Sequence, residues 1–162
     1  MAYDGEVIDA CGVTSVNLSK VDVVAVSGAG PNICGHTLLH ANGHYFHVAV
    51  IHGQPHHMNE AGYRRYLVEN GKTEIRRVTV TLPDPAGAEK YLERLMASTW
   101  TWYVVPNNCV AFVEEVIAAG GGTWASATNC PTVATAPDLS HRVQEFMQRL
   151  ENEIYTLYGV PR

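Results

Sequence analysis

The dipeptide Asn42-Gly43 constrains the fold more than any other feature of this chain. It separates two runs that resemble β-strands, residues 37–41 and 44–51. Asn-Gly is the strongest short signal for a two-residue hairpin, because a type I′ turn needs positive φ at both positions. In such a turn the last residue of the first run faces the first residue of the second. The sequence therefore predicts an antiparallel hairpin with a fixed register.

This register gathers histidines on one face of the hairpin. Seven of the eight histidines lie between residues 36 and 57. Cross-strand neighbours on a diagonal lie about 5–8 Å apart, and His36 and His47 are such a pair. The pair suits a general base, His36, whose second ring nitrogen is held by another polar group, His47. Alternation along the strands predicts one common face for His36, Leu38, His40, Tyr45, His47 and Ala49.

The other histidines have a plainer interpretation. His40 and His44 flank the turn, so we expect them to be exposed to solvent. The stretch from residue 53 to 71 is polar, and we expect an irregular loop with a short helix near residues 63–68. Histidines in or beside that stretch are expected on the surface: His52, His56 and His57.

A metal site is the sharper alternative for the histidine cluster. His47 with either His36 or His40 offers two ligands, and a third ligand would come from His56-His57 or Glu60. His36 and His40 cannot share a metal, because four residues of strand separate them by about 13 Å. No His-Glu-x-x-His motif or comparable spacing is present. We therefore expect no metal and no cofactor.

Cys109 stands where a helix is expected to begin. Asn107-Asn108 supplies an N-cap, and residues 109–119 carry apolar side chains at helical spacing before Gly120–Gly122 ends the run. Cys109 would then be the first or second helical residue, where the helix dipole stabilises a thiolate. The plain alternative is a small buried cysteine that merely starts a helix.

The remaining cysteines give no second motif. None of Cys11, Cys34, Cys109 and Cys130 forms a Cys-x-x-Cys pair, which excludes a zinc knuckle or a thioredoxin-like motif. We expect reduced thiols, with a Cys11–Cys130 disulfide left open. Cys34 lies two residues before His36 and would be the nucleophile of an unpermuted arrangement, but no helix begins there.

The rest of the chain predicts an α+β fold in one domain, residues 1–162. Strands are expected at residues 21–26 and 74–82, and extended chain at residues 100–105. Asp84-Pro85 caps a helix that runs to Met96, and Ser140 caps a final amphipathic helix. The sum is an antiparallel sheet of about four to five strands packed against about three helices.

Charge and hydropathy exclude several classes of protein. The formal net charge is −5 and the basic residues are scattered, so a nucleic-acid partner is not expected. No apolar run approaches the roughly 20 residues of a transmembrane helix. The first residues have neither a basic nor an apolar segment of a Sec signal peptide, so we expect synthesis in the cytoplasm without Sec export.

Two motifs together resemble a known group. The first, Gly35-His36-Thr37-Leu38, lies at the start of an expected strand. The second, Asn107-Asn108-Cys109, lies some seventy residues later at the start of an amphipathic helix that contains the motif Phe-Val-x-x-Val. This order is similar to that of the circularly permuted papain-like superfamily. That superfamily includes permuted relatives of NlpC-type cell-wall peptidases and the lecithin–retinol acyltransferase family. The likeness covers about residues 35–122, and the first 30 and last 40 residues match nothing in it.

The resemblance implies a function and a fold. It places Cys109 on the nucleophile, His36 on the base and His47 near the third polar position of a permuted papain-like domain. It implies a cysteine hydrolase that cleaves amide bonds, and peptidoglycan is the substrate that we expect first. Some bacterial members are antibacterial toxins, so a contact-dependent route such as type VI secretion and a cognate immunity protein are expected. The alternatives are an acyltransferase or thioesterase, a non-catalytic binding module, or a metal-binding module that uses residues 36–57.

Overall fold

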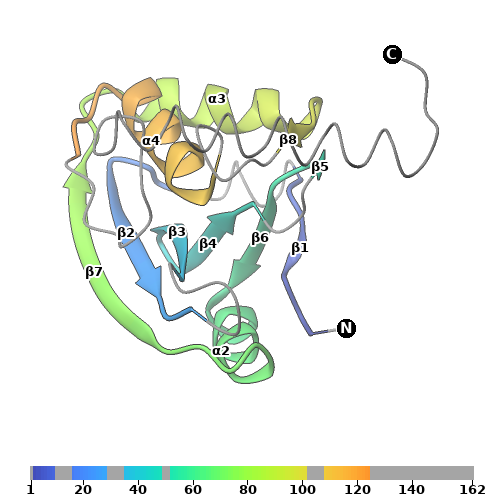
Figure 1. Ribbon diagram of the computed structural model, residues 1–162. Coiled ribbons are helices and arrows are strands. Elements are labelled where there is room, and N and C mark those ends of the chain that lie inside the picture. The colour runs from blue at the N-terminus through green and yellow to red at the C-terminus, as the bar shows by residue number, and fades with distance from the viewer. Residues whose placement is uncertain (1, 10–15, 29–34, 49–51, 102–107, 125–162) are drawn as a thin grey trace, which may run out of the picture.

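The computed structural model describes residues 2–9, 16–28, 35–48, 52–101 and 108–124, which form a sheet between helices (Figure 1). The main sheet is antiparallel and six-stranded, in the order β1-β6-β4-β3-β2-β7: β1 (Glu6–Val7), β6 (His56–Asn59), β4 (His44–His47), β3 (His36–Ala41), β2 (Lys20–Val26) and β7 (Glu74–Thr81). A separate pair joins β5 (His52–Gly53) to β8 (Trp100–Thr101). The helices are α2 (Glu60–Glu69), α3 (Pro85–Met96) and α4 (Cys109–Ala119). The predicted α+β class is confirmed, with six strands in the main sheet rather than four to five.

The hairpin is the one that the sequence predicts. Asn42 and Gly43 have φ values of 47° and 78°, as a type I′ turn requires. Leu39 pairs with Phe46, and Ala41 pairs with His44. The predicted register is therefore confirmed over the described residues, and Ala49 lies outside them.

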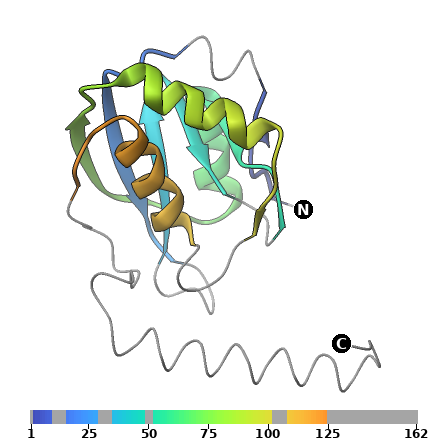
Figure 2. The same cartoon turned by 90° about the horizontal axis from the view of Figure 1, so that it is seen from above.

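Different helices pack on the two faces of the sheet. Seen from above, α3 and α4 lie in front of the sheet and α2 lies behind it (Figure 2). Leu39 and Phe46 pack with α3 and α4, whereas Leu38 and Tyr45 pack with Tyr66 of α2. Successive residues of β3 thus serve opposite faces. His36 follows the alternation of Leu38, so its side chain belongs to the α2 face.

One end of the sheet holds the termini of four strands. β2 and β4 end there at Val26 and His47, while β3 and β6 begin there at His36 and His56. Helix α4 packs against β3 and β4 on the other face. Groups from the two faces can meet only around such an end. The fold therefore puts His36, His47 and His56 together at this end of the sheet.

The polar stretch after the hairpin corrects the expectation. Residues 53–71 were expected to be an irregular loop, but β6 adds a strand beside β4, and α2 begins at Glu60 rather than near residue 63. Asn59 caps α2 by accepting from the Gly62 N–H at 2.9 Å. Local sequence gives little sign of β6, because Met58 is its only apolar residue. Pairing with β4 is what makes it a strand.

The other predicted elements agree with the structure where it describes them. β2 and β7 cover the two expected strands, and Asp84 caps α3 with Pro85 as its first residue. β8 covers the first two residues of the extended run at 100–105; the rest of that run and the helix expected from Ser140 lie outside the described residues. Within the described part of the chain, no helix is long and apolar enough to cross a membrane.

The turn yields a stability test. A Cβ at position 43 would meet nothing within 4 Å, so a substitution there acts through backbone conformation alone. Gly43→Val should cost roughly 1–2 kcal/mol, because a β-branched residue resists positive φ. Gly43→Asn should cost much less, since asparagine tolerates this region. Chemical denaturation measures both variants, and equal stability of the two would contradict the type I′ assignment.

Candidate active site

The start of α4 is built around an asparagine cap. The Asn108 side chain accepts from the Val110 N–H at 2.9 Å and from the Ala111 N–H at 3.1 Å. Cys109 is therefore the first helical residue, as predicted, and lies at the positive end of the helix dipole. Cys109 is 3% exposed and packs in the core cluster of the α4 face. Because the cap engages the N–H groups of Val110 and Ala111, these two groups are not free to bind a ligand.

The two histidines predicted to be diagonal neighbours are hydrogen-bonded. His36 Nε2 lies 2.9 Å from His47 Nδ1, and the ring centroids are 5.0 Å apart in an edge-on arrangement. His47 is 1% exposed. The hairpin thus brings together the pair that the sequence proposed as base and orienting group.

The hydrogen bonds assign the proton positions of this pair. His47 Nε2 lies 3.0 Å from the Asp4 carbonyl oxygen, which can only accept, so Nε2 of His47 carries a proton. Burial first, and then the charges of His36 and His56, hold the pKa of His47 well below its ordinary value, so its ring is neutral. His47 Nδ1 must then accept, and His36 Nε2 donates to it. In a neutral His36 ring the remaining lone pair is on Nδ1, the position of a general base.

Tyr66 contacts the histidine pair, and the charge of Cys109 affects its pKa. It comes from α2 and is 2% exposed, and its ring centroid lies 6.5 Å from that of His36 and 5.5 Å from that of His47. Burial raises its pKa, and the charges of Asp4 and Cys109 raise it further. His36 and His47 therefore contact the ring of Tyr66, and Cys109 is near enough to raise its pKa. The sequence gave no role to Tyr66, because only the docking of α2 on the sheet brings it here.

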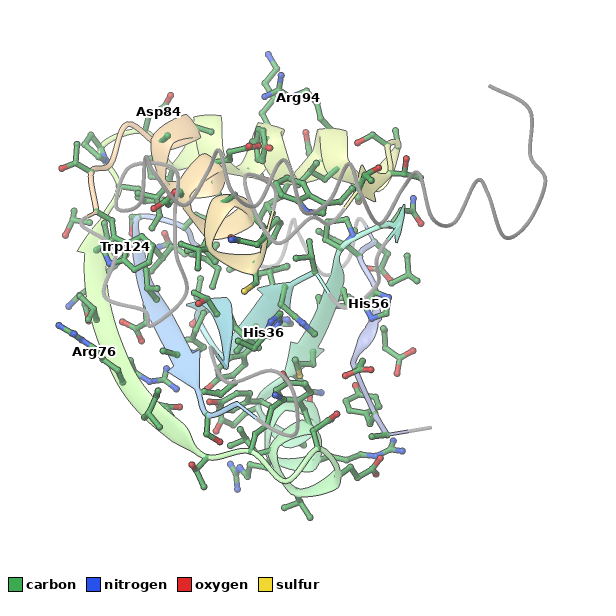
Figure 3. The ribbon with its side chains drawn as sticks, in the orientation of Figure 1. His36, His56, Arg76, Asp84, Arg94 and Trp124 are labelled. Atoms are coloured by element: carbon green, nitrogen blue, oxygen red, sulfur yellow. The ribbon has the colours of Figure 1, made fainter. Side chains whose placement is uncertain are left out.

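Figure 3 shows the same arrangement in space. The first turn of α4 stands over β3, the strand that begins with the labelled His36. The labelled His56 lies to the side of β4, toward the N-terminal segment. The structure thus brings His36 and His47 together and packs α4, which begins with Cys109, against β3, whereas Cys11, Cys34 and Cys130 lie outside the described residues.

The expected exposure of the other histidines is wrong where the structure describes them. His40 is 18% exposed; its Nδ1 lies 3.0 Å from Asp22 Oδ2, and its Nε2 accepts from the Gly43 N–H. His44 and His57 each bury an Nδ1 that has no hydrogen-bond partner. His56 is half-buried, and for His52 only the backbone is described. For His44 and His57 the strand β6 is the reason, because it pairs beside His44 in β4 and takes His57 out of the expected loop. His40 is instead held by Asp22 and Arg77.

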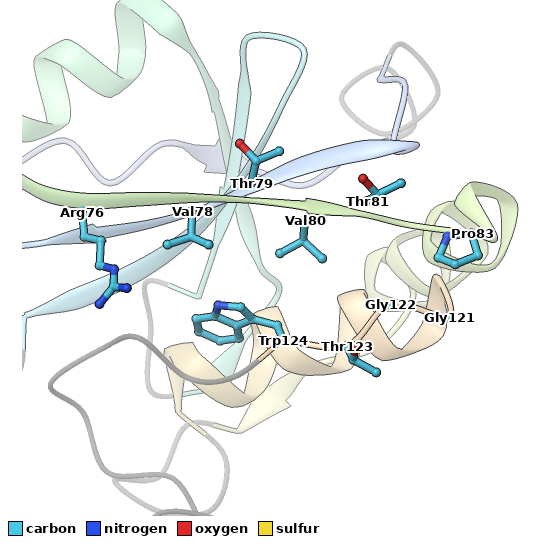
Figure 4. A pocket seen from close by; sticks show the side chains of 10 residues that line it. All are labelled: Arg76, Val78, Thr79, Val80, Thr81, Pro83, Gly121, Gly122, Thr123 and Trp124. Carbon is cyan, nitrogen blue, oxygen red and sulfur yellow. The ribbon is translucent and has the colours of Figure 1, made fainter.

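Two further features bear on ligands. No group of three or more His, Cys, Asp or Glu side chains among the described residues is placed to hold a metal ion. A pocket of about 490 Å³ lies between β7 and the segment after α4, with Val78, Val80 and Trp124 among its lining residues (Figure 4). It borders the last turn of α4, roughly 16 Å along the helix from Cys109. Cys109 is not among the residues that line this pocket.

Comparison of the chain with protein-family models, curated proteins and solved structures found no match. The likeness to the permuted papain-like superfamily therefore stays a prediction from the motifs around His36 and Cys109. The chemistry of the site rests on the positions of its own residues.

The buried histidine predicts a dependence of stability on pH. The pKa of His47 lies well below 6.5 in the folded chain and near 6.5 in the unfolded chain. Below pH 6.5 His47 binds a proton in the unfolded chain but not in the folded chain. The stability conferred by neutral His47 is therefore complete above pH 6.5 and is lost as the pH falls. The loss approaches about 1.4 kcal/mol per pH unit.

Denaturation of wild type and His47→Gln between pH 7.5 and 5.5 tests this dependence. The variant should lose less stability over that range, because glutamine does not titrate. His44, whose pKa is also lowered, is present in both proteins and cancels in the difference. Equal slopes in the two proteins would mean that His47 is not held neutral.

Proposed function

We propose that this protein is a cysteine hydrolase of the permuted papain-like kind that cleaves amide bonds. Cys109 is the nucleophile, His36 the base and His47 the group that orients the base. The observation that carries the proposal is the hydrogen-bonded chain from the Asp4 carbonyl through His47 to His36. It leaves the lone pair of His36 on Nδ1, at the start of β3, the strand against which α4 packs.

The reaction follows from these protonation states. His36 Nδ1 takes the proton of the Cys109 thiol, and the thiolate attacks the carbonyl carbon of the substrate. His36 is then protonated on both nitrogens and still donates from Nε2 to His47, so the hydrogen bond persists through the step. The amine leaves with the proton from Nδ1, and an acyl-enzyme remains on Cys109. Water hydrolyses it, whereas an amine or hydroxyl acceptor would give acyl transfer.

Peptidoglycan peptide bonds are the proposed substrate, with the protein acting as an antibacterial effector. The resemblance carries this part of the proposal, and so it carries a contact-dependent delivery route and an immunity protein as partner. An acyltransferase or thioesterase would share the same acyl-enzyme and would differ only in the bond attacked or the acceptor.

The burial of Cys109 favours a second candidate. A thiol that is 3% exposed and packed in the core cluster also fits a non-catalytic binding module of the same fold. In that module Cys109 would be inert, and Asn108 would serve only as a helix cap. The reactivity of the thiol separates the two candidates.

Alkylation by iodoacetamide, read by peptide mass spectrometry across pH, measures that reactivity. Cys109 should react faster than Cys11, Cys34 and Cys130, with an apparent pKa well below the reference of about 8.5. His36→Ala should raise that pKa, because it removes the base beside the thiol. An unreactive Cys109 in the folded protein, or one indifferent to His36, would favour the binding module.

Digestion of peptidoglycan fragments tests the substrate. Cys109→Ala and His36→Ala should each lower the rate by about 1,000-fold or more, because they remove members of the reacting pair. His47→Gln should cost less, since the base remains in place. Val7→Ala, at an exposed position of β1, is the control. Cleavage that survives in Cys109→Ala would rule out this nucleophile, and transfer to an added amine would identify an acyltransferase.

A further inference from the structure

The N-terminal segment, residues 2–5, passes beside the histidine pair. We propose that this segment is part of the site: the Asp4 carbonyl fixes the tautomer of His47, and His56 is a positioning residue that holds the carbonyl in place. The consequence for catalysis rests on the proposed function. The assignment of protons does not, since it follows from the hydrogen bonds of His47 together with its burial.

The carbonyl receives two hydrogen bonds from two strands. His47 Nε2 lies 3.0 Å from the Asp4 oxygen, and His56 Nδ1 lies 2.9 Å from the same oxygen. A carbonyl oxygen has two lone pairs and accepts both. The two rings stand edge-on with centroids 6.1 Å apart, so each lies in a different direction from the oxygen. His56 Nδ1 is the donor in this contact, because a carbonyl oxygen can only accept.

The local backbone presents this carbonyl to the histidines. Gly5 has φ of 86°, and a Cβ there would stand 2.7 Å from the His57 carbonyl oxygen. Beyond Gly5, Val7 of β1 pairs with His56 of β6. Before it, the Tyr3 N–H donates to Glu69 of α2 at 2.8 Å. Contacts with β6 and with α2 thus hold the segment in place on both sides of Asp4.

The tautomer of His47 decides what His36 can do. With its proton on Nε2, His47 accepts from His36, and the lone pair of His36 is on Nδ1. With its proton on Nδ1, His47 would donate to Nε2 of His36, and a neutral His36 would then carry its own proton on Nδ1 and have no lone pair there for a base. Only an acceptor at Nε2 of His47 selects the first arrangement. The Asp4 carbonyl is that acceptor, and it cannot become a donor at any pH.

Histidine-selective ¹⁵N labelling and long-range ¹H–¹⁵N correlation spectra report the tautomers directly. In wild type both His36 and His47 should carry the proton on Nε2. His56→Leu removes the donor that holds the carbonyl, and the His47 signals should shift toward a mixture of tautomers. His56→Asn should restore them, because the Nδ2 of asparagine lies near the place of Nδ1 of histidine. Ile75→Ala, on the distant edge strand β7 at an exposed position, should leave them unchanged.

The alkylation rate of Cys109 gives the second readout. His56→Leu should lower it about fivefold, the effect of one ordinary hydrogen bond, and His56→Asn should recover it. Gly5→Ala should act like His56→Leu, since it displaces the carbonyl from the other side. A merely structural role for His56 would lower thermal stability without the recovery of both readouts by asparagine.

Different outcomes overturn different claims. A wild-type His47 protonated on Nδ1, or a His56→Leu protein with unchanged tautomers, would overturn the role of the N-terminal segment. Where His56→Leu does not fold, the wild-type spectrum and Gly5→Ala decide the same question. If the tautomers behave as stated but Cys109 does not react, the inference about the carbonyl stands, and the proposed hydrolase is wrong.

Discussion

A buried, neutral histidine is the interaction on which the rest of this site depends. His47 uses both ring nitrogens, one toward the Asp4 carbonyl and one toward His36. Burial opposes its protonation, and the neighbouring histidines oppose it further. A charged His47 would donate from Nδ1 to Nε2 of His36 and leave the proton of a neutral His36 on Nδ1, so the neutrality of His47 is what frees the Nδ1 lone pair of His36. The lone pair on Nδ1 of His36 follows from this one constraint.

A separate network of hydrogen bonds and ion pairs stabilises the α2 face of the sheet. Arg77 of β7 donates to Glu74 at 2.8 Å, to Asp22 of β2 at 3.2 Å and to the Tyr45 hydroxyl of β4 at 3.0 Å. The Tyr45 hydroxyl in turn donates to Glu60 of α2 at 3.0 Å. A network that is partly screened from water contributes more than isolated surface pairs. It ties α2 to three strands and so fixes the helix that carries Tyr66 against the histidines.

Much of the candidate site was predictable, because its signals are local. Asn42-Gly43 set the turn, the turn set the register, and period-two alternation then put His36 beside His47. The Asn108 cap placed Cys109 at the start of its helix. The strand β6 was not predictable, because His56 and His57 have no apolar periodicity, and only the exposed edge of β4 makes them a strand. The roles of Tyr66 and of the Asp4 carbonyl were not predictable either, because their contacts are with segments far away in the sequence.

The sequence by itself determined the local geometry of this protein: a hairpin with one register, two capped helices and a thiol at a helix start. These depend on φ preferences and on hydrogen bonds within a few residues, which the order of amino acids specifies directly. Only the tertiary structure decided which nitrogen of each histidine carries a proton and what surrounds the thiol. Those properties depend on burial and on acceptors from distant segments, and neither exists until the sheet, α2 and the N-terminal segment have packed together.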